Sequence, residues 1–332
     1  MRRLAKLAVL LALLWSGMWL AAGYGLRAGI DGWFAAQRRH GWQADYATLS
    51  TAGYPLRHVT TIDGPALADP GTGAAWRGDW LRLESPAVWP GRQTLRFPDT
   101  PQRLSFFDRT SVIRARDMQA RLDLRLGQAL ELQRLALTSG DWRLEDPQGA
   151  VMGADDLTLS MAQGDRPERY RIEISAADFT PGAALRLHTG SAAALPPGFD
   201  RLVLTMEVSF DRPWDRRALE QRRPQPREIA LEQADIHWGA LRLQASGSLR
   251  VDAQGIPSGE IALRAENWRE MLAMAQAAGA IPPQALEPVE RVLTLLSGGD
   301  GAEVLDSRLR FAEGLVALGP LPLGPAPRLL LR

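Results

Sequence analysis

The chain has 332 residues, of which 45% are hydrophobic and 23% are charged, and its formal net charge is +1 at pH 7. This composition is typical of one large or two medium globular domains, and so small a net charge argues against nucleic acid as a partner. Cysteine is absent from the sequence, which excludes disulfides, thiolate catalysis and zinc sites built on thiolates.

The first predicted element is an uncharged apolar segment at residues 7–26. A helix of this length rises about 30 Å, which is the thickness of a bilayer core. We therefore predict a transmembrane anchor at 7–26, preceded by a cytoplasmic N-terminus at 1–6. Trp15, Trp19 and Tyr24 are typical of a retained anchor. A cleaved signal peptide is the alternative, because Ala21-Ala22-Gly23 is a possible cleavage site.

The basic residues Arg2, Arg3 and Lys6 lie immediately before this segment and favour a cytoplasmic N-terminus. The bulk of the chain then lies outside the cytoplasm. We predict a single-pass protein of the inner membrane with its main domain in the periplasm. Residues 27–50 follow as a predicted juxtamembrane helix.

Residues 51–332 are predicted to form an extracytoplasmic β-rich domain. Gly53-Tyr54-Pro55 ends the helical region, because the residue before a proline is driven toward extended backbone. Predicted strands then follow at short intervals: 80–84, 94–97, 103–107, 111–118, 120–126, 130–137, 141–145, 157–161, 169–175, 229–238, 240–245, 247–251, 259–265, 307–311 and 315–318. Such spacing predicts a mainly β fold, a long antiparallel meander that forms a curved or curled sheet.

Several of these strands alternate strictly between apolar and polar residues. Side chains two residues apart share one face of a strand, so the alternation predicts one apolar and one polar face. We expect the apolar face to contact lipid. The candidate lipid-facing residues are Leu122, Leu124, Leu126, Leu202, Leu204, Met206 and Val208.

Residues 211–227 interrupt the strands with prolines and a group of arginines. One interpretation is a basic patch that contacts anionic lipid headgroups, through Arg216, Arg217, Arg222 and Arg223. The alternative is a solvated surface loop between two strands.

A helical hairpin is predicted at about 267–297. Asn267 is a favourable N-cap for its first helix. Leu286, Val289, Leu293 and Leu296 recur at helical spacing in the second helix and predict one buried face. Such a hairpin is suited to cover part of a sheet.

The chemistry of catalysis is missing from the sequence. Its histidines stand singly, and neither an HExxH motif, a P-loop nor a Gly-x-Ser-x-Gly motif is present. Asp155 and Asp156 are adjacent, so in a strand they would point to opposite faces. We therefore predict that the protein is not an enzyme and has no cofactor, no metal and no catalytic residues.

The C-terminal half carries an ordered series of glycine-containing motifs: Trp238-Gly239-Ala240-Leu241, Gly247-Ser248-Leu249, Gly255, Gly259-Glu260-Ile261, Asn267-Trp268, residues 313–320 and residues 323–327. With the entry motif at residues 53–57, this series resembles an uncharacterised family of membrane-anchored Gram-negative envelope proteins, known by a domain-of-unknown-function label. The family is distantly similar to AsmA-like proteins.

The resemblance implies an N-terminal anchor and a long periplasmic β-structure, and it suggests a role in organising lipid. We therefore expect a membrane-anchored envelope protein that binds or organises lipid through an apolar sheet face. The alternative is a structural or protein-interaction scaffold with a closed β core. The expected partners are membrane lipid and other envelope proteins.

Overall fold

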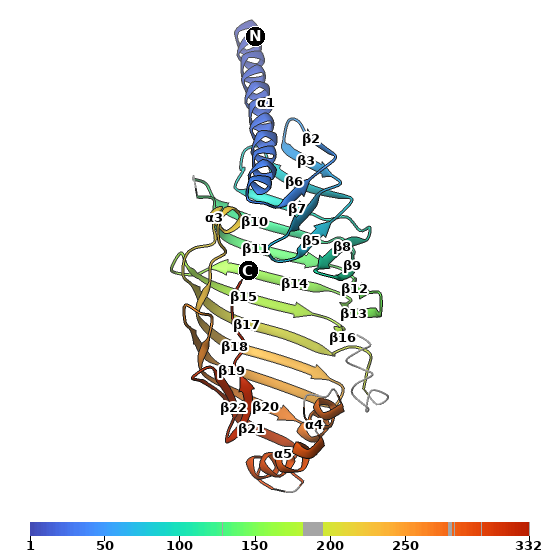
Figure 1. Ribbon diagram of the computed structural model, residues 1–332. Helices are drawn as coiled ribbons and strands as arrows, with labels where there is room; N and C mark the ends of the chain where they lie inside the picture. The colour runs from blue at the N-terminus through green and yellow to red at the C-terminus, as the bar shows by residue number, and fades with distance from the viewer. Residues whose placement is uncertain (128, 182–194, 278–280, 282, 300, 332) are drawn as a thin grey trace.

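The computed structural model describes residues 1–127, 129–181, 195–277, 281, 283–299 and 301–331. The chain begins with one long helix, α1 (Arg2–Arg39), which projects from one end of an elongated β-structure (Figure 1). Two antiparallel sheets follow, and a pair of helices closes the far end. The prediction of a mainly β protein with antiparallel strands, an N-terminal apolar helix and a C-terminal helical hairpin is confirmed.

The larger sheet has 15 strands and an open order that runs from β2 to β23, with no pairing between its first and last strands among the described residues. The pairing therefore does not support a curled sheet. Its strands are β2 (Thr48–Ala52), β3 (Arg57–Asp63), β6 (Trp80–Pro86), β7 (Arg92–Arg96), β10 (Gln119–Arg125), β11 (Glu131–Ser139), β14 (Leu157–Gln163), β15 (Arg169–Ala176), β17 (Arg201–Phe210), β18 (Pro226–Trp238), β19 (Leu241–Val251), β20 (Pro257–Glu266), β21 (Val304–Ala312), β22 (Leu315–Leu318) and β23 (Leu321–Pro325).

The smaller sheet has eight strands and lies beside the N-terminal part of the larger one. It consists of β1 (Gln43–Asp45), β4 (Ala66–Asp69), β5 (Ala74–Arg77), β8 (Gln102–Phe106), β9 (Arg109–Ala115), β12 (Trp142–Asp146), β13 (Gly149–Ala154) and β16 (Thr180–Pro181).

From β2 to β16 the chain alternates in pairs of strands between the two sheets. Very short connections join them, such as Gly64-Pro65 between β3 and β4 and Asp155-Asp156 between β13 and β14. The smaller sheet therefore continues the strands of the larger sheet beyond a bend. Gly64 permits the bend, because it adopts a φ of +59°. Trp142, Ala115 and Ala154 of the smaller sheet pack against Leu202 of the larger sheet on the inside of the bend.

The juxtamembrane helix predicted at 27–50 is too long, because α1 ends at Arg39 and residues 43–45 and 48–52 form strands β1 and β2. Gly41, with a φ of +90°, turns the chain after the helix. β1 and β2 then pair with β4 and β3. These long-range pairings override the local helical pattern. On one side of the helix, Phe34 is buried with Ile30 and Trp33 against the first strands.

The other strand predictions are largely correct, with several differences, among them that β3 and β16 were not predicted as strands. The strands expected at 240–245 and 247–251 are one strand, β19, because Gly247 stays paired with Leu231 and Ile261. Short strands rich in alanine and glycine, such as β4, β5 and β13, were not predicted, because they lack the apolar alternation. β23 also forms in the tail, which was not predicted as a strand.

Helices α4 (Trp268–Ala277) and α5 (Pro283–Leu296) form the predicted hairpin, while residues 278–280 and 282 between them lie outside the described part of the chain. Asn267 occupies the predicted N-cap position, because its carbonyl oxygen accepts the backbone N–H groups of Glu270 and Met271. Its side chain does not cap the helix, however. Its φ is +58° instead of the usual extended value, and its side chain donates to the carbonyl oxygen of Ala240. A further helix, α3 (Arg217–Glu220), lies in the loop between β17 and β18.

Candidate functional site: the apolar face of the large sheet

One face of the large sheet carries a row of apolar side chains that crosses the strands. Cross-strand partners lie directly opposite each other and share a face, so the pairing register defines the row. It runs through Leu83, Leu95, Ala120, Leu137, Leu159, Ile174, Leu204, Ala234, Ala245 and Leu263. With strands about 4.8 Å apart, this first apolar row extends over roughly 40 Å from β6 to β20.

A second apolar row runs parallel to the first, two residues further along each strand. It comprises Leu122, Leu135, Met161, Ile172, Met206, Leu231, Gly247, Ile261, Leu309 and Leu318. The members of both rows are buried or half-buried. The two rows form a continuous surface, which we call the apolar face.

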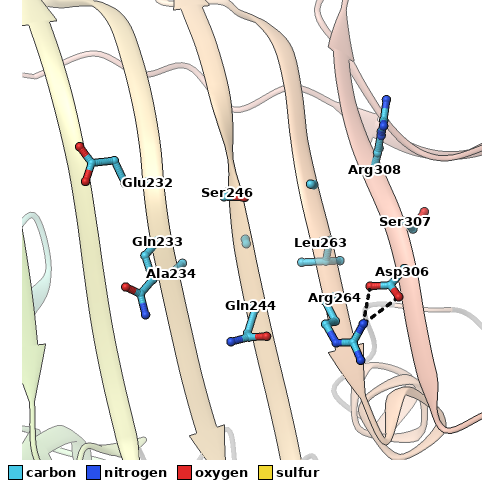
Figure 2. A pocket seen from close by; sticks show the side chains of 12 residues that line it. Glu232, Gln233, Ala234, Gln244, Ser246, Leu263, Arg264, Asp306, Ser307 and Arg308 are labelled. Carbon is cyan, nitrogen blue, oxygen red and sulfur yellow. Dashed lines mark hydrogen bonds and ion pairs between the residues drawn. The ribbon is translucent and has the colours of Figure 1, made fainter.

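The opposite face of the same sheet is charged and mostly exposed. Cross-strand ion pairs lie along it, including Arg171 with Glu232 at 2.7 Å and Arg264 with Asp306 at 2.9 Å. Figure 2 shows the second pair in a hollow formed by β18, β19, β20 and β21, with Glu232 and Arg308 nearby. This hollow is polar, so it differs in chemistry from the apolar face.

The two ends of the apolar face are covered by helices. At the N-terminal end, Phe34 of α1 packs with Ile62 of β3 and Ala44 of β1. At the C-terminal end, Trp268 and Leu272 of α4 and Leu293 of α5 pack on Ala265 and Leu305. Between these ends, the smaller sheet accompanies the larger one only as far as β16 within the described residues, so β17 to β21 have no facing strands there.

One long edge of the apolar face is closed by the segment after β17. The hydroxyl of Tyr170, which is fully buried, donates to the carbonyl oxygen of Leu132 at 3.0 Å. It also accepts the backbone N–H of Trp214 at 3.2 Å. The Trp214 side chain packs against Phe210 in the same cluster. Tyr170 therefore fixes this segment over the ends of β11 and β15.

The structure divides the predicted lipid-facing residues into three groups. Leu122, Leu204 and Met206 belong to the two rows, and Leu122 and Met206 also pack against the buried cluster around Tyr170. Leu124, Leu202 and Val208 share that face but pack into the clusters at its edges, where Val208 is buried. Leu126 lies beyond the end of β10, and it is 52% exposed at the edge of the sheet. Alternation alone does not distinguish the middle of a strand from its ends.

The predicted headgroup arginines are engaged within the protein in at least two cases. Arg217 forms an ion pair with buried Asp215 at 2.5 Å, and Arg222 forms one with Asp211 at 2.6 Å. The hydrogen bond from Arg217 holds the pKa of Asp215 below its usual value against the opposing effect of burial. Arg216 and Arg223 are exposed. Two of the four predicted arginines are thus held by acidic side chains of the same loop, while residues 211–227 keep six arginines against three acidic residues.

A charged cluster that sequence reasoning missed surrounds Asp235, whose side chain is only 5% exposed. Its carboxylate lies 3.0 Å from Nε of Arg201, 3.0 Å from Nε2 of His237 and 3.5 Å from Nε of Arg242. Nε2 of Gln244 donates to it at 3.3 Å. Burial opposes ionisation, but His237, Gln244 and Arg242 outweigh it, so the pKa of Asp235 lies below its usual value. Cross-strand positions could have suggested this cluster only once the register was known.

The variant Asp235→Asn is expected to lower the free energy of unfolding by about 1–3 kcal/mol at pH 6. The reason is that Arg201, His237 and Gln244 lose a charged acceptor. A depressed pKa stabilises the fold above the unfolded-state value of 3.8 and loses that contribution as pH falls through the folded-state value. The difference between wild type and variant should therefore shrink below about pH 4. Urea titrations between pH 3 and pH 7 measure it.

The control for this prediction is Asp306→Asn, which breaks an exposed pair with Arg264 and should cost about 0–1 kcal/mol. An equal cost for the two variants at pH 6 would contradict the stabilising role of the Asp235 cluster.

Within the described residues, no group of three or more His, Asp or Glu side chains is placed to hold a metal ion. The apolar face serves as the candidate site.

The fold and this face define a class: an open antiparallel β-sheet protein with one apolar face, joined to an N-terminal helix that is long and apolar enough to cross a membrane. Residues 19–327 match the family model described as "Uncharacterized protein conserved in bacteria (DUF2125)", and the chain belongs to this family. No curated protein matches the chain.

Proposed function

We propose that this protein is held in the inner membrane by α1 and that it binds lipid acyl chains on its apolar face in the periplasm. The observation that carries the proposal is the pair of apolar rows, which extend over roughly 40 Å while no facing strands lie opposite β17 to β21 in the described residues. An apolar surface of this size is costly in water, so it marks an interaction site.

Lipid suits this face better than a protein partner does. The rows consist of Leu, Ile, Met and Ala with one glycine, Gly247, and they include no charged side chain and few groups that could donate or accept a hydrogen bond. A specific protein interface carries about one hydrogen bond per 100–200 Å² and is enriched in aromatic and arginine anchors. Acyl chains need neither. The second candidate, a structural scaffold with a closed core, is supported where the smaller sheet packs near Trp142, where Trp214 packs beside Tyr170, and where the helices cover the ends of the face.

Retention of α1 is part of the proposal, and contacts of the helix with the sheet support it. Nε1 of Trp15 donates to the carbonyl oxygen of Pro55, and Nε1 of Trp19 donates to that of Arg57, both at 3.1 Å. The His58 ring stacks on Trp19 at 4.7 Å, and its Nε2 lies 3.0 Å from the Trp19 carbonyl oxygen. Cleavage within residues 21–23 would remove all of these partners.

We therefore expect the mature protein to keep residues 1–22. Intact-mass measurement of the protein from the membrane fraction of a Gram-negative host checks this, because cleavage after Ala22 would remove the mass of that segment. A shortened protein in the soluble fraction would contradict retention. The location of the sheet is tested separately by protease protection in spheroplasts, where a periplasmic domain is digested.

The proposed role is binding, without catalysis. It is also the lipid-organising role that the distant resemblance to AsmA-like envelope proteins suggests. The test is native mass spectrometry of the full chain released from a mild detergent. We expect phospholipid to remain bound in stoichiometric amounts. Delipidated protein that takes up no added phospholipid would overturn the proposal. An envelope protein that is tightly bound where phospholipid was expected would favour the scaffold.

A further inference from the structure

Two neighbouring turns at the N-terminal end of the sheet expose large apolar side chains. The first turn, residues 53–57 between β2 and β3, presents Tyr54 at 54% and Leu56 at 73% exposure. The second, residues 86–91 between β6 and β7, presents Val88 at 72% and Trp89 at 55%. The turns are joined, because the backbone N–H of Ala87 donates to the carbonyl oxygen of Leu56 at 2.9 Å.

The first turn lies against the middle of the apolar segment of α1. Besides the bonds from Trp15 and Trp19, the hydroxyl of Tyr54 lies 2.8 Å from Oγ of Ser16. The Tyr54 ring meets Trp19 edge-on at 5.5 Å. In Figure 1, β2, β3 and β6 accordingly lie beside the C-terminal half of α1.

The level of this contact in a membrane follows from the charges that bracket the helix. Lys6 and Arg27 are the basic residues on either side of the apolar segment, and at 1.5 Å per residue they lie about 31 Å apart, close to the thickness of a bilayer core. Trp15 then lies about 14 Å from Lys6, near the bilayer centre. The turn that contacts Trp15 and Ser16 therefore lies within the bilayer half nearer the sheet.

The exposed surface of α1 at that level is also apolar. Trp15, Trp19 and Gly23 face the sheet, whereas Met18, Leu20 and Tyr24 are at least half exposed on other sides of the helix. The exposed side chains of α1 and of the two turns thus form one apolar belt. A water-exposed position for the turns would leave only residues 4–14 to cross the membrane, about 16 Å, which is half of what a bilayer core requires.

We propose that the turns at residues 53–57 and 86–91 insert into the periplasmic leaflet of the inner membrane beside α1. This inference rests on the proposed retention of the anchor. The polar atoms at the contact support it, because non-helical backbone is tolerated in lipid only where its polar groups are satisfied within the protein. The carbonyl oxygens of Pro55, Leu56 and Arg57 each accept a hydrogen bond.

Arg27, which contacts β2, and Arg57, which belongs to the first turn, both suit this position. Nε of Arg27 donates to Oγ1 of Thr51 at 3.2 Å, which fixes the end of the span against β2. The Arg57 side chain is exposed. Long arginine side chains can extend from an apolar level to the headgroups. The sheet would then begin within the lipid, with its apolar rows reaching outward from the leaflet.

The natural absence of cysteine makes the test direct, since single cysteines can be introduced and labelled with an environment-sensitive fluorophore. The full chain carrying Leu56→Cys or Val88→Cys is reconstituted in vesicles of phosphatidylethanolamine and phosphatidylglycerol. We expect blue-shifted emission that is quenched by lipids with a nitroxide on the acyl chain and not by aqueous iodide. Leu295→Cys, on exposed α5 at the far end, is the aqueous control.

A third variant, Leu13→Cys, reports on the anchor itself. If position 13 is quenched from lipid while positions 56 and 88 are quenched by iodide, the inserted turns are refuted and the anchor stands. If position 13 is also quenched by iodide, the anchor fails with them. Val88→Cys decides alone if Leu56→Cys does not fold, since the two turns are hydrogen-bonded to each other.

Discussion

Replacing Leu204 with arginine is expected to abolish binding of phospholipid to the purified protein. Leu204 lies in the middle of the first apolar row, between Ile174 of β15 and Ala234 of β18. A guanidinium placed against acyl chains costs about 2.5–3.5 kcal/mol, on the scale measured for the centre of a membrane helix. Since every 1.4 kcal/mol changes an affinity tenfold, the expected loss is roughly 100-fold.

The neighbouring residue supplies the matched control. Thr205 follows Leu204 in β17 but belongs to the opposite face, where it pairs with Glu173. The variant Thr205→Arg adds the same charge to the same strand and should keep wild-type lipid content. Lipid is extracted from each variant and quantified by mass spectrometry, and thermal unfolding in the same detergent confirms that each variant is folded.

Two outcomes would contradict lipid binding on the apolar face. One is a folded Leu204→Arg variant that retains as much phospholipid as the wild type. The other is equal loss in both variants, which would indicate that lipid binds elsewhere or through the net charge. Loss of a copurifying envelope protein only in Leu204→Arg would support the scaffold instead.

The sequence predicts the long strands well because apolar and polar residues alternate along nearly every one of them. It does not predict that the strands belong to two sheets. Only two residues separate the strands at the bends Gly64-Pro65 and Asp155-Asp156, and β4 and β13 lack apolar alternation, so the sequence does not mark where one sheet ends and the other begins. Only the pairing partners mark that boundary, and these lie far apart in the chain.

For the candidate site, the sequence likewise predicted which residues share a face but not which side chains contact each other. Alternation predicted that Leu122, Leu204 and Met206 share one face, and the pairing register confirms that they do. It could not show which arginines are neutralised by Asp211 and Asp215, because those contacts depend on how the loop folds. The turn that contacts Trp15 and Trp19 was equally hidden, since about 40 residues separate the partners. Side-chain contacts over such distances leave no local pattern.

Substituting Leu293 with alanine is expected to lower the free energy of unfolding by about 2–5 kcal/mol, the usual range for a buried leucine. Leu293 is 5% exposed and packs with Trp268, Leu272 and Leu305 where the helical hairpin covers the end of the sheet. Its removal leaves a cavity against Trp268. Since Trp268 Nε1 donates to the carbonyl oxygen of Ala302 at 3.0 Å, the indole is held in place and cannot readily fill that cavity.

Leu295 of the same helix is the control, because it is 76% exposed and its substitution with alanine should change stability by at most about 0.5 kcal/mol. Denaturant titration of both variants in detergent measures the difference. A similar small effect at both positions would mean that the hairpin is not docked on the sheet. The end of the apolar face would then be open, and an acyl chain could extend past β20 toward Leu305 and Leu318, which the hairpin otherwise covers.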